Sequence, residues 1–205
     1  MAETAAFRDA VEHWAAGGPA GQAGELAARL GLRTVVLLEG PSDLAAVDAL
    51  AARHGRDLAA EGVCVVTMNG AMNVGRFARV LGPPGLGLRL TGLCDERERG
   101  YFDRALERAG APARDVFVCV ADLEDEFIRA LGTERVEAVV AAEGDLRAWE
   151  IFLGQPAQQG RPRERQLRRF LGTKKGRKIH YGRALAQALG PGELPAPLDA
   201  LFAGL

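Results

Sequence analysis

The sequence predicts an α/β protein with a parallel sheet of about four strands, flanked by helices and followed by a helical C-terminal extension. Four short apolar runs, rich in Val and Leu, occur in the first part of the chain, and patterns of helical period separate them. After residue 122 no further strand pattern occurs, and glycines divide the remaining sequence into short helical segments. Strands that alternate with helices are typical of a parallel sheet with helices on its faces.

The first elements surround the strand predicted at residues 34–38. Two short helical patterns within residues 3–30 precede it, and the first of them is amphipathic, so it is expected either to pack on the core or to form a frayed arm. The strand itself is short, apolar and β-branched at its start, which is typical of a buried parallel strand. A Gly-Pro pair ends it, and Ser42 or Asp43 is predicted to cap a helix over residues 43–54.

The later elements continue this alternation and then become helical. Strands and helices are predicted in turn at 62–68, 72–81, 86–94, 97–109 and 115–120. The helices predicted after the last strand are 123–131, 134–142, 145–153, 163–171 and 177–189. In the Pro-rich tail, Leu198, Leu201 and Phe202 are expected to pack back onto the core. The chain is thus expected to have three parts, namely an N-terminal helical segment (1–30), an α/β core (31–132) and a helical C-terminal extension (133–205).

The composition excludes several classes of protein. Of the 205 residues, 48% are hydrophobic and 26% charged, which indicates a globular protein rather than a disordered one. The net charge of -1 gives no global attraction to nucleic acid or membrane. Three dispersed cysteines (Cys64, Cys94 and Cys119) favour a reducing cytoplasm over a disulfide framework. Neither a signal peptide nor a long apolar run is present, so a cytoplasmic location without membrane contact is expected.

Carboxylates follow three of the four predicted strands. Glu39 comes after the first, Asp95 after the third, and Asp122 with Glu124 after the fourth, while Asp43 begins the helix after Glu39. Because parallel strands end at one edge of a sheet, these side chains are expected to converge. Crowded carboxylates repel one another unless a cation neutralises them, and Mg²⁺ prefers oxygen ligands. The pattern predicts one or two Mg²⁺ or Mn²⁺ ions, suited to phosphodiester cleavage by a metal-activated water.

For any single acid, a helix cap or a solvated loop residue is the simpler interpretation. That interpretation is kept for the remaining acids near the strand ends, which are Asp103, Glu107, Asp125 and Glu126. The joint occurrence at three strand ends is what favours a metal site.

An ordered set of motifs then points to a known family. An apolar strand runs into Leu38-Glu39-Gly40-Pro41-Ser42-Asp43, and a later strand ends in an acidic cluster at Asp95. Further motifs are Asn69-Gly70 with Asn73, then Asp122-Leu123-Glu124, and a late lysine, Lys178. The first two resemble the Toprim domain of topoisomerases, primases and related nucleases, and the whole set resembles the nuclease domain of the OLD (overcoming lysogenization defect) family over roughly residues 32–190.

The resemblance implies a Toprim/Rossmann-like sheet and a Mg²⁺- or Mn²⁺-dependent endonuclease that acts on DNA, with RNA as another substrate to test. Glu39 and Asp43 match the first metal-binding motif of the family, and Asp95 matches the first acid of its Asp-x-Asp motif. Glu124 matches the Leu-Glu motif, and Lys178 matches the lysine near the scissile phosphate. Glu39, Asp95 and Lys178 are therefore the expected catalytic residues, and Asp122 is expected to join the metal ligands.

Two features depart from the family pattern. Arg97 stands where the second Asp of Asp-x-Asp is expected, and Glu98, one position further on, is the candidate to replace the missing carboxylate. No phosphate loop of the form GxxxxGK[ST] occurs, so a stand-alone Toprim domain, or one whose ATPase partner is a separate protein, is expected.

Residues 161–178 form a basic segment in a chain that is otherwise nearly neutral. Leu167, Phe170 and Leu171 give it an apolar side, so we expect a packed helix with one basic face. Such a face attracts phosphate backbones without reading sequence, although a merely solvated helix face is the other interpretation. The residues expected to contact nucleic acid are Arg163, Arg165, Arg168, Arg169, Lys174, Lys175 and Arg177.

Two alternatives to a DNA endonuclease stay open. One is a catalytically weakened Toprim module that binds nucleic acid or a partner ATPase, which is favoured if Arg97 empties a metal site. The other is a different Toprim chemistry, such as that of a primase or an rRNA-maturing nuclease.

Overall fold

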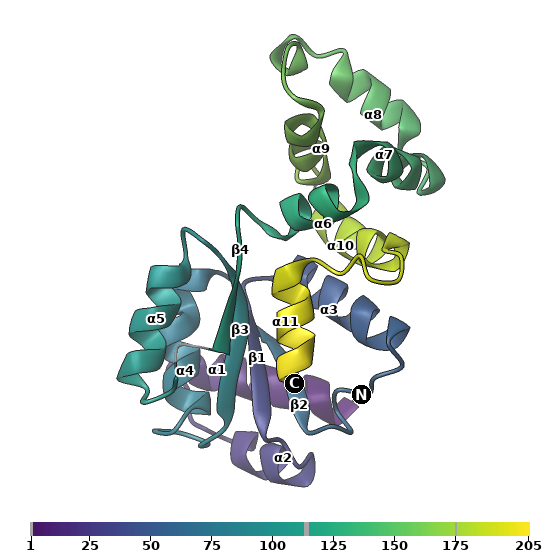
Figure 1. Cartoon of the computed structure of the whole chain (residues 1–205). Coiled ribbons are helices and arrows are strands. Elements are labelled where there is room, and N and C mark those ends of the chain that lie inside the picture. Colours follow the sequence, from purple (N-terminus) through teal and green to yellow (C-terminus); the bar gives the residue numbers. More distant parts are fainter. Residues whose placement is uncertain (1, 113–114, 175) are drawn as a thin grey trace.

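The computed structural model describes residues 2–112, 115–174 and 176–205, and its centre is a four-stranded parallel sheet. The strand order is β2-β1-β3-β4, which confirms the predicted fold class. The strands are β1 (Thr34–Leu38), β2 (Val63–Thr67), β3 (Arg89–Asp95) and β4 (Val116–Cys119). Helices cover both faces of the sheet, as Figure 1 shows.

The parallel register brings the carboxyl ends of the strands to one edge of the sheet. Leu38, the last residue of β1, lies opposite Thr67 in β2, and Asp95, the last residue of β3, lies opposite Cys119 in β4. The residues that follow the strands therefore emerge side by side at this carboxyl edge.

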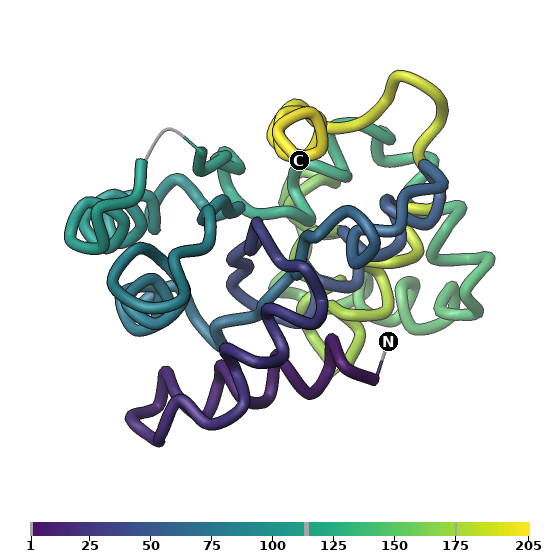
Figure 2. The backbone as a smooth tube through the Cα atoms, turned by 90° about the horizontal axis from the view of Figure 1, so that it is seen from below, coloured from purple at the N-terminus to yellow at the C-terminus, as the bar shows by residue number. Residues whose placement is uncertain are grey.

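One face of the sheet is covered by helices from the first half of the chain (Figures 1 and 2). These are α1 (Ala2–Ala15), α2 (Ala23–Arg29), the short 3-10 helix η1 (Ala71–Asn73), α4 (Val74–Leu81) and α5 (Arg99–Arg108). Val35 and Leu37 of β1 face this core, where Phe7 and Val11 of α1 are completely buried. The first helix thus packs on the core and is not a frayed arm.

The core on the other face of the sheet is formed by α3 and the C-terminal helices. These are α3 (Pro41–Arg53), α6 (Leu123–Leu131), α7 (Thr133–Ala142), α8 (Leu146–Leu153), the 3-10 helix η3 (Pro156–Gln158), α9 (Arg163–Leu171), α10 (Arg177–Ala188) and α11 (Ala196–Gly204). Val36 and Leu38 of β1 belong to the same continuous core as Trp149 of α8, and Leu198, Leu201 and Phe202 of α11 are buried in it as predicted. The helices α7, α8 and α9 stand beyond the carboxyl edge (Figure 1).

Both cores reach the sheet, and the division of the chain into three parts stays a prediction. Within the described ranges, no helix combines the length and the apolar character needed to cross a bilayer.

Two predicted element boundaries need correction. The helix expected from residue 43 begins at Pro41, because Gly40 is its extended N-cap and proline at the first position has no N–H to leave unpaired. Asp43 therefore lies inside the first turn, where its carboxylate accepts a hydrogen bond from the Gly40 N–H at 3.0 Å. The strand expected from residue 86 begins at Arg89, because Gly87 has a φ of 69°, which a strand does not allow.

A close contact between α3 and α10 fixes how the C-terminal helices approach the sheet. A Cβ atom added to Gly182 would lie 2.6 Å from the carbonyl oxygen of Ser42, which is closer than real Cβ atoms approach backbone. Lys178 precedes Gly182 by about one helical turn. The glycine thus lets α10 bring Lys178 to the start of α3, beside Asp43.

Gly182→Ala is expected to lower the free energy of unfolding by about 1–3 kcal/mol, because the added methyl group must push α10 away from the α3 backbone. Gly75→Ala in α4 is the matched control, since its nearest neighbour would be 4.0 Å away. That change is expected to stabilise the protein, because alanine favours a helix over glycine. Urea unfolding followed by circular dichroism measures both, and equal effects of the two changes would contradict the packing role of Gly182.

Candidate metal centre and nucleic-acid interface

Three carboxylates meet at the carboxyl edge of the sheet. Glu39 directly follows β1, Asp95 ends β3, and Glu98 is the N-cap residue of α5. The turn between β3 and α5 is closed by a hydrogen bond from the Glu98 N–H to the Asp95 carbonyl oxygen at 2.9 Å. One carboxylate oxygen of each residue lies within 4.8 Å of the others, and these three residues are called the carboxylate triad below.

A small cavity of about 20 Å³ lies beside the triad. Its polar lining comes from Glu39, Asp43, Asp95, Asp122 and Lys178, and its apolar floor includes two cysteines of β3 and β4. This volume holds about one water-sized species. Acids from three separate parts of the sequence therefore lie around this one cavity.

Burial and mutual repulsion change the acidity of these groups. Burial, followed by the charges of Glu98, Asp122 and Glu39, raises the pKa of Asp95 to about 7. Burial and the Glu124 carboxylate raise the pKa of Asp43 to about 7 as well, although Lys178 partly opposes this. Burial is also the main reason why the pKa of Glu98 lies above its ordinary value.

The triad has the chemistry of a site for a hard divalent cation. Its donors are all carboxylate oxygens, which Mg²⁺ and Mn²⁺ prefer. The Oε2 atom of Glu98 is buried and has no hydrogen-bond partner within the described part of the chain. A buried acceptor of this kind is costly unless a proton or a cation satisfies it. The residues present therefore fit a bound divalent ion.

The other three predicted ligands already have partners. Asp122 is the N-cap of α6, where it accepts hydrogen bonds from the Asp125 N–H at 2.9 Å and from Arg168 Nε at 2.6 Å. Glu124 is buried, and its Oε2 atom lies 3.2 Å from Lys178 Nζ. With Asp43 bound to the Gly40 N–H, all three face donors of the protein itself. They form a second group beside the triad, which the sequence alone did not distinguish from it.

Lys178 lies where the two groups of acids and the solvent meet. Burial acts to lower the pKa of its ammonium group, but the charges of Glu124 and Asp43 outweigh it and raise the pKa. The side chain remains 47% exposed, so the charge of Lys178 is accessible to a ligand.

Two open grooves flank Lys178. One, called the basic groove, has a volume of about 750 Å³ and is lined by the cationic residues Arg97, Arg161, Arg165, Arg168, Arg169 and Lys178. The other has a volume of about 530 Å³ and runs past Pro41, Asn69, Gly70 and Lys174. A phosphate backbone lying in both grooves would cross Lys178 beside the acids.

Some of the residues predicted to contact nucleic acid line the two grooves, and others do not. Arg165, Arg168 and Arg169 line the basic groove, and Lys174 lines the second groove. Lys175 lies outside the described residues. Arg161, which begins the basic segment, and Arg97, which the sequence pattern did not assign to this surface, also line the basic groove. For Arg97 the only available signal was its position in the turn before α5.

Arg163 and Arg177 instead connect the C-terminal helices to one another. Arg163 pairs with Glu137 at 3.0 Å and lies over the Trp149 ring. Arg177 pairs with Asp145 at 3.2 Å, and its guanidinium group lies 4.1 Å from the centre of the Phe170 ring. Neither lines the basic groove, and their predicted nucleic-acid contacts stay untested predictions.

A parallel sheet in this order, with helices on both faces and acids at its carboxyl edge, defines a Toprim-like α/β domain. The sequence agrees with this, because residues 32–96 match the family described as "Overcoming lysogenization defect protein-like, TOPRIM domain". Residues 32–96 therefore match an OLD-like Toprim domain, as the sequence motifs predict. The sequence matches none of the curated proteins.

Solved structures share the fold over most of the chain. The C-terminal region of the Burkholderia pseudomallei OLD protein has a TM-score of 0.61 and 21% sequence identity, over 84% of this chain and 96% of that chain. The C-terminal region of the Xanthomonas campestris pv. campestris OLD protein has a TM-score of 0.62 and 23% identity, over 84% of this chain and 93% of that chain. At these identities the similarity concerns the fold.

Asp95→Asn is expected to stabilise the metal-free protein at neutral and alkaline pH. Because the folded state raises the pKa of Asp95 from 3.8 to about 7, folding favours its protonated form. The stability of the metal-free protein should therefore fall as pH rises from about 4 to about 7, and the asparagine variant should lack this part of the loss. Thermal unfolding in EDTA across this pH range measures the difference between the two proteins.

Asp103→Asn on α5 is the matched control, since Asp103 is half exposed and paired with Arg99 at 3.6 Å. Added Mn²⁺ should stabilise the unmodified protein at pH 8 and have less effect on Asp95→Asn. A stability difference that does not change with pH would contradict the assigned titration of Asp95.

Proposed function

We propose that this protein is a divalent-metal-dependent nuclease that hydrolyses DNA phosphodiester bonds at the carboxyl edge of its sheet. The observation that carries the proposal is the carboxylate triad, with one oxygen of each residue within 4.8 Å of the others, at the junction of two grooves that carry cationic residues. The match to an OLD-like Toprim domain supports it.

In this proposal Glu39, Asp95 and Glu98 hold one Mg²⁺ or Mn²⁺ ion. When bound, such an ion supplies an activated water and neutralises charge on the phosphate. A single ion is proposed because the second group of acids is occupied by Arg168 and Lys178. Glu98 takes the place of the acid that the family pattern expects at the position of Arg97.

Lys178 would stand beside the scissile phosphate and stabilise the negative charge that develops during cleavage. Glu124 positions Lys178 through their ion pair, so the ammonium group is held in place before the substrate arrives. Arg165, Arg168 and Arg169 would hold the phosphate backbone without reading the bases.

The family match and the chemistry of the chain support two further parts of the proposal. The match to an OLD-like Toprim domain supports an ATPase partner on a separate chain. Three free, buried cysteines suit a reducing cytoplasm.

Glu98→Gln is expected to weaken Mn²⁺ binding by at least about tenfold, since even residues that only support metal ligands contribute this much. Cleavage of supercoiled plasmid should fall with it, whereas Asp103→Asn should leave both unchanged. Isothermal titration with Mn²⁺ and gel assays on plasmid, linear DNA and structured RNA measure these effects. The nuclease proposal fails if the unmodified protein cleaves none of these substrates with Mg²⁺ or Mn²⁺, while cleavage of RNA alone would assign RNA as the substrate.

Lys178→Ala is expected to lower the cleavage rate by roughly 10²–10³-fold, the effect of removing one group that stabilises transition-state charge. Mn²⁺ affinity should stay within a small factor, because Lys178 is not a ligand. Lys178→Arg should restore part of the rate, since it restores the charge. Equal loss in both variants would assign Lys178 a packing role instead.

A second candidate function is a module that binds nucleic acid without cleaving it. The specific observation in its favour is that Arg97 replaces a family acid while Asp122 and Glu124 are paired with cations. Arg97→Asp separates the two candidates. If Glu98 supplies the missing ligand, the change should gain little activity, whereas activity that appears only in Arg97→Asp would identify the unmodified protein as the binding module.

A further inference from the structure

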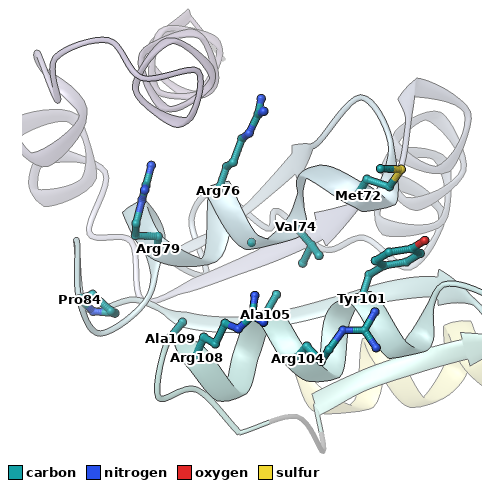
Figure 3. A pocket seen from close by; sticks show the side chains of 11 residues that line it. Met72, Val74, Arg76, Arg79, Pro84, Tyr101, Arg104, Ala105, Arg108 and Ala109 are labelled. Atoms are coloured by element: carbon teal, nitrogen blue, oxygen red, sulfur yellow. The ribbon is translucent and has the colours of Figure 1, made fainter.

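A second cationic surface lies on the opposite face of the sheet from α3, between α4 and α5. It is an open groove of about 400 Å³, and Figure 3 shows the side chains that line it. Its floor contains Val74 and Ala105, and its walls carry Arg76 and Arg79 from α4 and Arg104 and Arg108 from α5. We call it the arginine groove.

The four arginines have no carboxylate among their neighbours in the groove. Within the described part of the chain none of them forms an ion pair, and Arg104 instead lies over the Tyr101 ring at 5.4 Å from its centre. In the view of Figure 3 the guanidinium groups of Arg76 and Arg79 extend from α4 on the side away from α5. Four unpaired cations on one surface of a chain with a net charge of -1 favour an anionic ligand.

One end of the groove adjoins the proposed metal centre. Tyr101 follows the triad residue Glu98 by one turn, and its N–H donates to the Glu98 carbonyl oxygen at 2.8 Å. Met72 follows β2 at the same carboxyl edge, and the two side chains stand together at one end of the groove (Figure 3). Pro84, after α4, stands at the other end. The groove therefore leads away from the triad.

We propose that the arginine groove binds a single-stranded segment of the nucleic-acid substrate that extends beyond the cleavage site. This inference rests on the proposed nuclease function and specifies its substrate. Arginines on both walls contact the phosphates, and Tyr101, which as a residue is 42% exposed, stacks its ring on the base nearest the triad. The groove has the size of a small-ligand site, so it suits unpaired nucleotides and not a duplex.

An acidic segment of a partner protein is the other ligand with matching charge. It would use the same arginines, but it would have no particular need for an aromatic platform one helical turn from a metal ligand. The position of Tyr101 next to Glu98 therefore favours nucleic acid.

The test compares two fluorescent probes by anisotropy, in EDTA so that no cleavage occurs. One is a blunt DNA duplex, and the other is the same duplex with a single-stranded extension of about ten nucleotides. The double variant Arg76→Ser/Arg79→Ser should lower the slope of log affinity against log salt by about 1.4 for the extended probe only, since each single-strand phosphate contact contributes about 0.7. Arg147→Ser/Arg183→Ser, which removes two exposed arginines elsewhere, should leave the slope unchanged.

Tyr101→Ala should weaken binding of the extended probe by roughly fivefold or more, the effect of losing one stacked base, whereas Tyr101→Phe should retain it. Equal salt slopes for the unmodified protein and Arg76→Ser/Arg79→Ser would overturn the proposal. So would arginine-dependent binding of a polyglutamate peptide without any effect of the extension, because that result identifies an acidic protein partner. The plasmid assay distinguishes a failure of this proposal from a failure of the nuclease proposal. Plasmid cleavage together with probe binding that does not depend on the extension refutes only the groove, and extension-dependent binding without plasmid cleavage refutes only the nuclease.

Discussion

Carboxylates crowd together at one edge of the sheet, and their mutual repulsion explains much of what surrounds them. Parallel strands place Glu39, Asp95 and the residues after β4 at the same edge, so the acids meet whether or not they are compensated. The pKa values of Asp43 and Asp95, both raised to about 7, show how far burial and proximity oppose their ionisation. Cations of the protein pair with the acids on one side of this cluster, whereas the carboxylate triad on the other side is proposed to bind a divalent cation.

Those cations come from the C-terminal helices. Lys178 of α10 faces Glu124, and Arg168 of α9 faces Asp122. The placement of Lys178 depends on packing beside the site, where Gly182 lets α10 approach the backbone of α3 at Ser42. The C-terminal helices thus complete an edge that the sheet alone would leave unstable, and they also supply one wall of the basic groove.

The packing of the C-terminal helices gives different roles to acids, and likewise to arginines, that the sequence does not distinguish. Asp122 and Glu124 serve as a helix cap and as the anchor of Lys178, while the triad keeps a buried oxygen of Glu98 without a partner in the described residues. Among the arginines, Arg165 and Arg169 line a groove, whereas Arg177 is held by Asp145. The role of each of these acids and arginines therefore depends on the residue that it contacts in the folded chain, and not on its residue type.

The four strands, their parallel arrangement and the acids at their ends could be predicted from the sequence. Short apolar runs and Gly or Pro breaks act over a few neighbouring residues, so local patterns reveal them. The Toprim motifs, including Glu39 and Lys178, were also readable from the sequence. Contacts in the folded chain bring the candidate acid Glu98 to Glu39 and Asp95, turn Arg163 toward Glu137, and form an arginine groove between α4 and α5. Those outcomes depend on contacts between residues distant in the chain, which local patterns do not encode.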